Sequence, residues 1–595
     1  MEHLHHYGVL VSPRYEGKNL TIEVKDRKIK LTPEKEEMAL AWAKKVGTSY
    51  VEDRIFAKNF HSDFSRKLGI KVKLGDIDYS EVISFVEKER ERKANLSRED
   101  KRQLAAQRKE QREANKERYG YAWVDGVRIE VANYAVEPSS IFMGRGKHPL
   151  RGRWKEGPRQ EDIELNLSPD SPKPLGNWKT IVWQPKAMWI AKWRDKLTGK
   201  MKYVWFSDSS IIKQRKDIEK FNKARELRQN LILVEKHIWD NIDAADIRRR
   251  KTATVCFLID KLRIRVGDEK DPDEADTVGA STLRPEHIHY NGDGTVTFNF
   301  LGKDSVPHVF TVELPGNVIR NLKEFEAKTS STLFDGVGSK NVSEFLDEVM
   351  IGLSAKVFRT CYASEAVETK LEKTPVKLED PEYRKRYIAT MANLEAAKIC
   401  NHRRIVLPKT WKLSLEKKKA RINALKERAK EAQVKLKQKA VERKQRFNER
   451  LKKMEKKLNE MKEKLDANLH LLADKRQKGK SVRALKKRVR HKREMVNLQN
   501  QRLKELKIKH AMQMKKLKQS LASRRQRDKV AIGSLRLKIV TQKETLEYNL
   551  ATSLKSYIDP RIYYEWGKKV DYNWKQYYPK TLQRKFNWLD IDEYT

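Results

Sequence analysis

The segment Arg476-Gln477-Lys478-Gly479-Lys480-Ser481 is the one good turn signal in a tract that otherwise predicts uninterrupted helix. From Leu413 to Leu550 the sequence contains no proline, and Gly479 and Gly533 are its only glycines. Glycine among polar residues favours a reversal of the chain. We therefore predict an antiparallel hairpin of two helices, each about 60 residues and about 90 Å long at a rise of 1.5 Å per residue.

Apolar residues on both sides of this turn form two seams with helical spacing, the first at mostly alternating steps of four and three residues. Such spacing is typical of a coiled coil. A dimerising coiled coil is the alternative, but the turn residues favour a chain that folds back on itself. The first seam comprises Phe447, Leu451, Met454, Leu458, Met461, Leu465 and Leu472, and the second, less regular seam comprises Val482, Leu485, Val489, Val496, Leu503, Leu506, Leu517 and Leu521.

A helical hairpin brings together residues that stand at equal distances from its turn. Gly479 lies midway in sequence between His402 and Tyr557. We therefore expect these two side chains to lie near each other, although 155 residues separate them. Pro560 closes the helix just after Tyr557.

The net charge points to a polyanionic partner. The 595 residues carry a formal net charge of +47, and the tract from Leu413 to Thr545 holds about 45 Lys and Arg against 14 Asp and Glu. Duplex DNA is the natural candidate, because each neutralised phosphate releases condensed counterions. RNA would fit equally well. An anionic membrane surface is the rival, but there is no long apolar run and no lipidation signal.

The cysteines and the absence of several known sequence motifs narrow the class of protein further. Cys256, Cys361 and Cys400 are widely spaced, which predicts reduced and buried thiols in an intracellular protein. The first residues lack a basic segment followed by an apolar one, so we expect no secretory signal. No metal-ligand spacing, phosphate-binding loop or dinucleotide fingerprint occurs, and we expect no metal and no cofactor.

Shifts in composition divide the chain into five predicted regions of a multidomain α+β protein that is mainly α. Alternating residues at 295–301 predict a strand that leads to a hairpin tip at Lys303, and periodicity predicts a helix from Val342 to Arg359. The regions are 1–118, mixed α/β with one long charged helix from Val82 to Tyr119; 119–210, β-rich; 211–408, compact and mostly helical; 409–548, the antiparallel coiled-coil linker; and 549–595, a small helical domain that should dock on 211–408 because it is too small to fold alone.

Five side chains could together break a phosphodiester without a metal. Tyr557 would be the nucleophile, since a phenolate is a competent and reversible leaving group. Arg265 and Arg359 would hold the two non-bridging oxygens, because a guanidinium fork matches phosphate geometry. His402 would donate a third hydrogen bond to one of these oxygens. Lys303 would be the general acid for the leaving 5′ oxygen.

Each of these residues also has a structural interpretation. The arginines could only pair with acids such as Asp268 or Glu365, His402 could be a satisfied core histidine, and Lys303 a plain turn residue. Taken singly, the signals are weak. Their order along the chain is what makes them specific.

That order resembles the eukaryotic-type DNA topoisomerase IB family. The likeness covers nearly the whole chain from about residue 8, apart from the hairpin, which is longer than the usual linker. The motifs that carry it are GRGKHP (144–149), KLRIRVGDEK (261–270), ADTVG (275–279), FLGKDS (300–305), AKVFRT (355–360), CNH (400–402) and YIDPRI (557–562).

The resemblance implies a DNA clamp in which a mixed α/β cap faces a mostly helical catalytic domain across encircled duplex. It implies a monomer that relaxes supercoils of both signs through a 3′-phosphotyrosyl intermediate, without ATP or metal. The protein would work on supercoiled double-stranded DNA in the nucleoid or cytoplasm, or in the nucleus of a eukaryote, away from membranes and with unknown protein partners. The implied DNA-contacting residues are Arg145, His148, Lys270, Thr277, Asp304, Ser305 and Lys356.

Three features depart from the family pattern. Lys555 stands one place later than the lysine of the usual Ser-Lys-x-x-Tyr. Ser556 replaces the asparagine that commonly precedes the nucleophile at the camptothecin site, which implies reduced sensitivity to that drug. The long charged N-terminal tail of the nuclear enzymes is missing, as in the shorter archaeal members.

Two rival functions stay open at this point. A tyrosine recombinase uses a similar residue set, but it usually carries His-x-x-Arg at the second arginine, where this chain has Lys356-Val357-Phe358-Arg359. Recombinases also do not usually carry a long helical hairpin between the histidine and the tyrosine. A non-catalytic basic architectural protein that binds DNA is the other rival.

Overall fold

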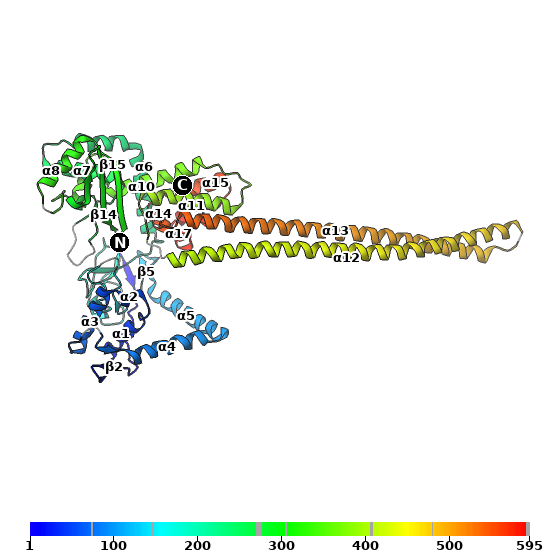
Figure 1. Ribbon diagram of the computed structural model, residues 1–595, viewed down its shortest axis with the longest axis horizontal. Coiled ribbons are helices and arrows are strands. Elements are labelled where there is room, and N and C mark those ends of the chain that lie inside the picture. Colours follow the sequence, from blue (N-terminus) through cyan, green and yellow to red (C-terminus); the bar gives the residue numbers. More distant parts are fainter. Residues whose placement is uncertain are drawn as a thin grey trace. The chain divides into compact units, whose positions relative to one another are not determined.

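The computed structural model of the protein divides into two compact units, which are described separately (Figure 1). One unit comprises residues 1–374, 392–404 and the chain from Tyr548 onward, and the other comprises residues 375–391 and 405–547. The residues that the structure describes are 1–72, 75–144, 148–268, 276–303, 306–329, 331–404, 408–478 and 480–590.

The first part of the larger unit packs helices on a small antiparallel sheet. Its sheet has the strand order β3-β2-β4, and its core includes Trp42, Phe56, Phe60 and Phe64. Asp53 begins α3 by accepting from the backbone N–H groups of residues 55 and 56. The elements are β2 (Thr21–Val24), β3 (Arg27–Lys30), α1 (Pro33–Ala43), α2 (Ser49–Glu52), α3 (Arg54–Leu68), β4 (Ile77–Asp78), α4 (Ser80–Asn95) and α5 (Arg98–Tyr119).

The prediction of one continuous helix from Val82 to Tyr119 is wrong. Helix α4 ends before Leu96. Ser97 then starts α5, because its side chain accepts a hydrogen bond from the Asp100 N–H at 3.0 Å. Acidic residues behind a serine cap favour a new helix start over continuation of the old one.

Two further sheets lie in the part of the chain before residue 211, and they share one hydrophobic core. One has the order β1-β5-β6 and the other β10-β9-β11-β12, and both contribute residues such as Leu4, Ile163 and Phe206 to the same cluster. The strands from β5 to β12 lie in the region predicted to be β-rich, residues 119–210. The elements are β1 (Leu4–His6), β5 (Tyr121–Val124), β6 (Val127–Glu130), β7 (Ser140–Ile141), β8 (Trp154–Lys155), β9 (Ile163–Asn166), β10 (Thr180–Val182), β11 (Trp189–Arg194) and β12 (Met201–Trp205).

The region from residue 211 is mainly helical around a three-stranded antiparallel sheet, β13-β14-β15. The predicted hairpin is confirmed, with Gly302 opposite Val306 in the last described pair. The helix predicted from Val342 to Arg359 is wrong: a loop containing Gly352, with φ +75°, separates α9 from α10. The elements are α6 (Ile211–Asp240), α7 (Ile247–Leu262), β13 (Ile288–Tyr290), β14 (Thr295–Gly302), β15 (Val306–Glu313), α8 (Gly316–Ala327), α9 (Ser339–Asp347), α10 (Ala355–Lys373) and α11 (Glu382–Ile399).

In the described part of the chain after residue 548, four short α-helices and a 3-10 turn (Asn587–Asp590) surround an aromatic core. Tyr563, Phe586 and Trp588 are almost fully buried. The side chain of Gln214 on α6 donates to Asn587 Oδ1 at 2.6 Å, so this small domain contacts the helical region as expected. The helices are α14 (Leu550–Ser556), α15 (Pro560–Val570), α16 (Trp574–Tyr577) and α17 (Lys580–Lys585).

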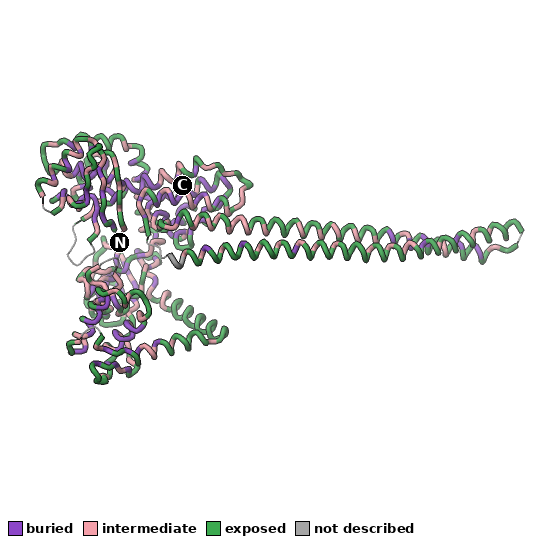
Figure 2. The backbone as a smooth tube through the Cα atoms, viewed as in Figure 1, coloured by how far each residue is buried: buried purple, intermediate pink, exposed green. Residues whose placement is uncertain are grey.

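The second unit is built on two long helices, α12 (Pro408–Gln477) and α13 (Arg483–Glu544), which run side by side (Figure 1). Contacts such as Phe447 with His510, whose ring centroids are 3.9 Å apart, and Arg525 with Gln433 at 3.4 Å show an antiparallel arrangement. The buried positions lie along the inner side of an otherwise exposed pair (Figure 2) and include Leu458, Leu465, Val489, Val496 and Leu503. Coiled-coil packing in the strict sense stays a prediction, and Gly479 of the predicted turn lies outside the described residues.

Candidate active site

Arg359 lies in the first turns of α10 and is buried, with 4% of its surface exposed. Its Nη2 donates to the backbone carbonyl of Cys400 and lies 3.4 Å from Nε2 of His402. Its Nε is buried and has no hydrogen-bond partner among the described residues. The guanidinium is therefore tied to the segment after α11 at one nitrogen and retains donor capacity at another.

Tyr557 caps the C-terminal end of α14, where its backbone N–H donates to the Ser553 carbonyl at 2.9 Å. Its ring centroid lies 5.0 Å from that of His402 and 5.0 Å from Cζ of Arg359. The Asn549 N–H also donates to the His402 carbonyl at 2.6 Å, which joins the two chain segments at their backbones. The structure thus brings together three of the five candidate residues.

The other two candidates meet Arg359 and His402 at a cavity of about 80 Å³. Arg265 and Lys303, both exposed, line this cavity. Lys303 reaches it because β14 ends at Gly302 and the chain turns there. None of the described residues that line the cavity is an aspartate or a glutamate, so the cavity is electropositive.

Neither of the two acids considered as partners of the arginines pairs with them in the described part of the chain. Within the described part of the chain, neither Arg265 nor Arg359 forms an ion pair. The two acids considered as their partners are engaged elsewhere: Glu365 lies 4.0 Å from Arg228, and Asp268 accepts from the Ser339 N–H at 3.0 Å. Two guanidiniums without acidic partners suit an anionic ligand.

His402 is held neutral. Burial and, to a smaller extent, the positive charges of Arg359 and Arg265 together lower the pKa of its imidazole to about 3. Its Nδ1 lies 2.7 Å from the hydroxyl of Ser553, which is fully buried on α14. Because a guanidinium can only donate, the contact with Arg359 uses Nε2 as an acceptor and leaves the ring proton on Nδ1, facing Ser553. Donation from Nε2 to an oxygen in the cavity requires the other tautomer, in which the serine hydroxyl donates to Nδ1.

Sequence reasoning missed several residues that line the same cavity. His308 stacks on Phe300 at 5.1 Å, and burial together with the charges of Arg359, Arg265 and Arg403 lowers its pKa to about 4. The imidazole packs closely over Gly302, where a Cβ atom would collide with it. The only available signal was position: His308 stands opposite Phe300 in the hairpin. The other polar lining residues that it missed are Arg403, Asn549 and Thr552.

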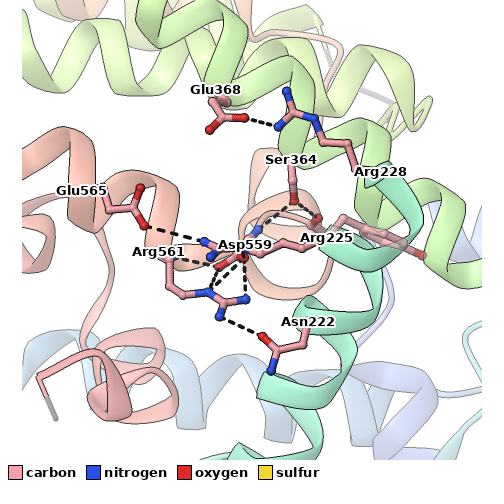
Figure 3. Close-up of polar contacts among 9 residues, drawn as sticks. Asn222, Arg225, Arg228, Ser364, Glu368, Asp559, Arg561 and Glu565 are labelled. Atoms are coloured by element: carbon pink, nitrogen blue, oxygen red, sulfur yellow. Dashed lines mark hydrogen bonds and ion pairs between the residues drawn. The ribbon is translucent and has the colours of Figure 1, made fainter. Parts of the chain in front are cut away.

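A buried polar network holds the backbone around Tyr557 (Figure 3). The hydroxyl of Ser364 on α10 donates to the Tyr557 carbonyl at 3.2 Å and accepts from the Asp559 N–H at 3.0 Å. The Asp559 carboxylate accepts from Arg225 of α6 at 2.9 Å and from Arg561, and it also caps α15. The nucleophile candidate is therefore fixed to two helices of the preceding region on either side of its peptide.

The residues implied to contact DNA are only partly visible. His148 packs against Phe142 with ring centroids 4.9 Å apart, Thr277 is half-buried, and Lys356 is exposed at the start of α10. Lys555 forms an ion pair with Asp208 at 2.8 Å and does not line the cavity. The remaining four, Arg145, Lys270, Asp304 and Ser305, lie outside the described residues.

Comparison with known proteins identifies the family. Residues 1–206 match the DNA binding fragment of eukaryotic DNA topoisomerase I, residues 209–436 its catalytic core, and residues 529–593 a C-terminal topoisomerase domain. The chain is 32% identical to DNA topoisomerase 1 beta of Arabidopsis thaliana over 604 residues, which cover 99% of this chain and 58% of that protein. It is 36% identical to DNA topoisomerase 1 alpha of the same plant over 438 residues, 72% of this chain and 47% of that protein.

A human relative extends the comparison. Human DNA topoisomerase 1 is 30% identical over 605 residues, which cover 98% of this chain and 70% of the human protein. The match therefore runs from the cap-like sheets through the cavity to the segment of Tyr557. The chain belongs to the eukaryotic DNA topoisomerase I family.

Proposed function

We propose that the protein is a type IB DNA topoisomerase that relaxes positive and negative supercoils by cutting and resealing one strand. The observation that carries this proposal is the position of the Tyr557 ring, 5.0 Å from the His402 ring and 5.0 Å from the Arg359 guanidinium carbon, next to a cavity lined by Arg265 and Lys303. Family membership favours this function over a tyrosine recombinase. It also favours it over an architectural protein.

The chemistry follows from what each group can donate. The Tyr557 oxygen attacks the phosphorus, the new O–P bond forms as the bond from phosphorus to O5′ breaks, and the strand is left as a 3′-phosphotyrosine and a free 5′ hydroxyl. The phenol gives its proton to solvent, Lys303 donates one to O5′ and is reprotonated from solvent, so the step is balanced. Resealing is the same step in reverse. The phosphotyrosine bond that forms replaces the phosphodiester bond that breaks, so the energy of the cut bond is retained for resealing.

The guanidiniums and the neutral imidazole stabilise the charge that develops on phosphorus. Arg359 and Arg265 bind the non-bridging oxygens, and His402 donates from Nε2 without adding charge. Because the Arg359 guanidinium and the imidazole are fixed before DNA binds, little reorganisation is needed as the transition state forms.

The partner of this chemistry is double-stranded DNA, preferably supercoiled, bound by a monomer whose cap and catalytic regions close around the duplex. The net charge of +47 supports a polyanion. In the described part of the chain, no helix combines the length and apolarity needed to cross a bilayer. The site of action would be the compartment that holds chromosomal DNA: nucleoid or cytoplasm, or the nucleus of a eukaryote.

Plasmid relaxation without ATP and in EDTA tests the proposal. Wild-type protein should relax positively and negatively supercoiled plasmid, and denaturation during the reaction should trap protein on a 3′ DNA end. Tyr557→Phe should abolish both, because no other oxygen replaces the phenol. Tyr564→Phe, which removes a hydroxyl from the same small domain away from the cavity, should leave both intact.

Each result separates the candidates. Relaxation that survives Tyr557→Phe would refute the assigned nucleophile. DNA binding with no relaxation by the wild type, with or without added divalent cations, would favour the architectural protein.

A further inference from the structure

The cavity holds more positive charge than one phosphate requires. Arg265, Arg359, Lys303 and Arg403 all line it, and none of its described lining residues is acidic. A phosphodiester carries a single formal negative charge. Three guanidiniums and an ammonium at one cavity offer enough donors to contact a phosphate beside the scissile one as well.

Arg403 is the cation that the roles assigned above leave without a task. It follows His402 directly, and Asn401, with φ +47°, turns the chain before it. The Arg403 N–H donates to the Asn401 carbonyl at 2.8 Å, and its Nε donates to Asn401 Oδ1 at 3.1 Å. The guanidinium carbon stands 5.9 Å from the ring centroid of Tyr548, so the exposed side chain is oriented by two neighbours.

His308 shows that the Arg403 guanidinium lies near Arg265 and Arg359. The charges of Arg359, Arg265 and Arg403 all act on the same buried imidazole. His308 and His402 stay neutral, so the positive charge at the cavity comes from the arginines and Lys303. The three guanidiniums thus face one space from three chain segments.

We propose that Arg403 forms a second phosphate subsite, which binds the backbone phosphate adjacent to the one attacked by Tyr557. The subsite rests on the proposed function. Arg403 would act by binding substrate, holding the strand in register so that the scissile phosphorus meets the phenol. A guanidinium serves this purpose because it can hold a phosphate by two parallel hydrogen bonds.

Single methylphosphonate substitutions test the subsite. We take a duplex that the wild-type protein cleaves at one mapped position and replace, one at a time, the phosphates on either side of the scissile one by uncharged methylphosphonates. For the wild type, one of these substitutions should slow single-turnover cleavage about tenfold, the effect of one charged hydrogen bond. Arg403→Gln should slow cleavage of the unmodified duplex by a similar factor. Its cleavage rate should be the same on the unmodified duplex and on the duplex with that methylphosphonate.

The matched control is Arg404→Gln, which removes the next guanidinium along the chain from a residue that does not line the cavity. This variant should keep the full sensitivity of the wild type to the methylphosphonate. Arg403→Lys should restore part of the rate and of the sensitivity if Arg403→Gln proves too slow to measure.

Additive losses from Arg403→Gln and from each methylphosphonate would overturn the subsite while leaving the proposed function intact. Equal behaviour of the Arg403 and Arg404 variants would overturn it as well. A wild-type protein that cleaves no duplex at all would instead refute the proposed function.

Discussion

At the residue scale, burial sets the protonation state of the histidines that face the cavity. His402 has its pKa lowered to about 3 and His308 to about 4, in both cases mainly because burial disfavours the charged ring. Both therefore enter the chemistry as neutral hydrogen-bonding groups. His402 can then donate a third hydrogen bond to the phosphate from a neutral ring, and this ring does not change its charge near neutral pH.

These lowered pKa values predict how stability responds to acid. Between the unfolded value of about 6.5 and the folded values, the unfolded chain binds more protons than the folded one, so the free energy of unfolding falls as pH falls. Each such histidine removes up to about 2 kcal/mol by pH 5. Thermal unfolding at pH 7.5 and pH 5 should show this loss, and His308→Phe should reduce it. An unchanged difference between the two pH values in that variant would show that His308 does not contribute.

At the scale of elements, the network around Asp559 fixes α15 and the Tyr557 peptide to α6 and α10. Asp559 is 3% exposed and its carboxylate is shared by two guanidiniums, Arg225 and Arg561. Removing the charge of such a buried group leaves its partners uncompensated, which typically costs about 3 to 5 kcal/mol. The cost falls on the attachment of the small C-terminal domain.

Asp559→Asn should therefore slow DNA cleavage and loosen α15. We expect faster hydrogen exchange in residues 560–570 and a lower thermal midpoint, with cleavage slowed about tenfold or more. Glu565→Gln is the matched control, because Glu565 pairs with the same Arg225 at 3.7 Å but is 53% exposed at its side chain, so it should change little. Exchange in α15 that is equally fast in both variants would contradict this role.

At the scale of the whole molecule, the positive charge is concentrated in the hairpin. Helix α13 alone, Arg483–Glu544, contains 21 Lys and Arg against 4 Asp and Glu. Its Lys487, Arg488, Lys515 and Lys516 are exposed. So dense a row of cations along one helix is costly without a polyanion nearby.

Salt dependence measures how many of these charges meet DNA. The logarithm of the DNA binding constant should fall linearly with the logarithm of salt concentration, with a slope of about −0.9 per phosphate contact. Replacing Lys487, Arg488, Lys515 and Lys516 by glutamine should make the slope shallower by up to about 4. Binding titrations from 50 to 200 mM salt check this, and a slope equal to that of the wild type would place the hairpin away from the DNA.

What could be predicted from the sequence was the part that local patterns control. A turn at Gly479 in a proline-free, periodic tract predicts two antiparallel helices, and the same symmetry predicts that Tyr557 returns to His402. The wrong predictions are also local: a serine cap at Ser97 and a loop at Gly352 each divide a run whose periodicity continues across the break. Periodicity shows which face of a helix is apolar, but it does not show where a cap or a short loop interrupts the helix.

The sequence by itself determined most of the elements, apart from the two helix breaks at Leu96 and Gly352, together with the charge and the order of the five candidate residues. Helix and strand patterns, net charge and family motifs need only neighbouring residues. Only the tertiary structure decided that Arg359 lacks an acidic partner among the described residues, that His402 is neutral, that Ser364 holds the Tyr557 peptide and that Arg403 joins the cavity. These properties depend on burial and on contacts between residues far apart in the sequence, such as Ser364 and Tyr557, which stand 193 positions apart. Desolvation and Coulomb energies act through space, and the linear chain does not record them.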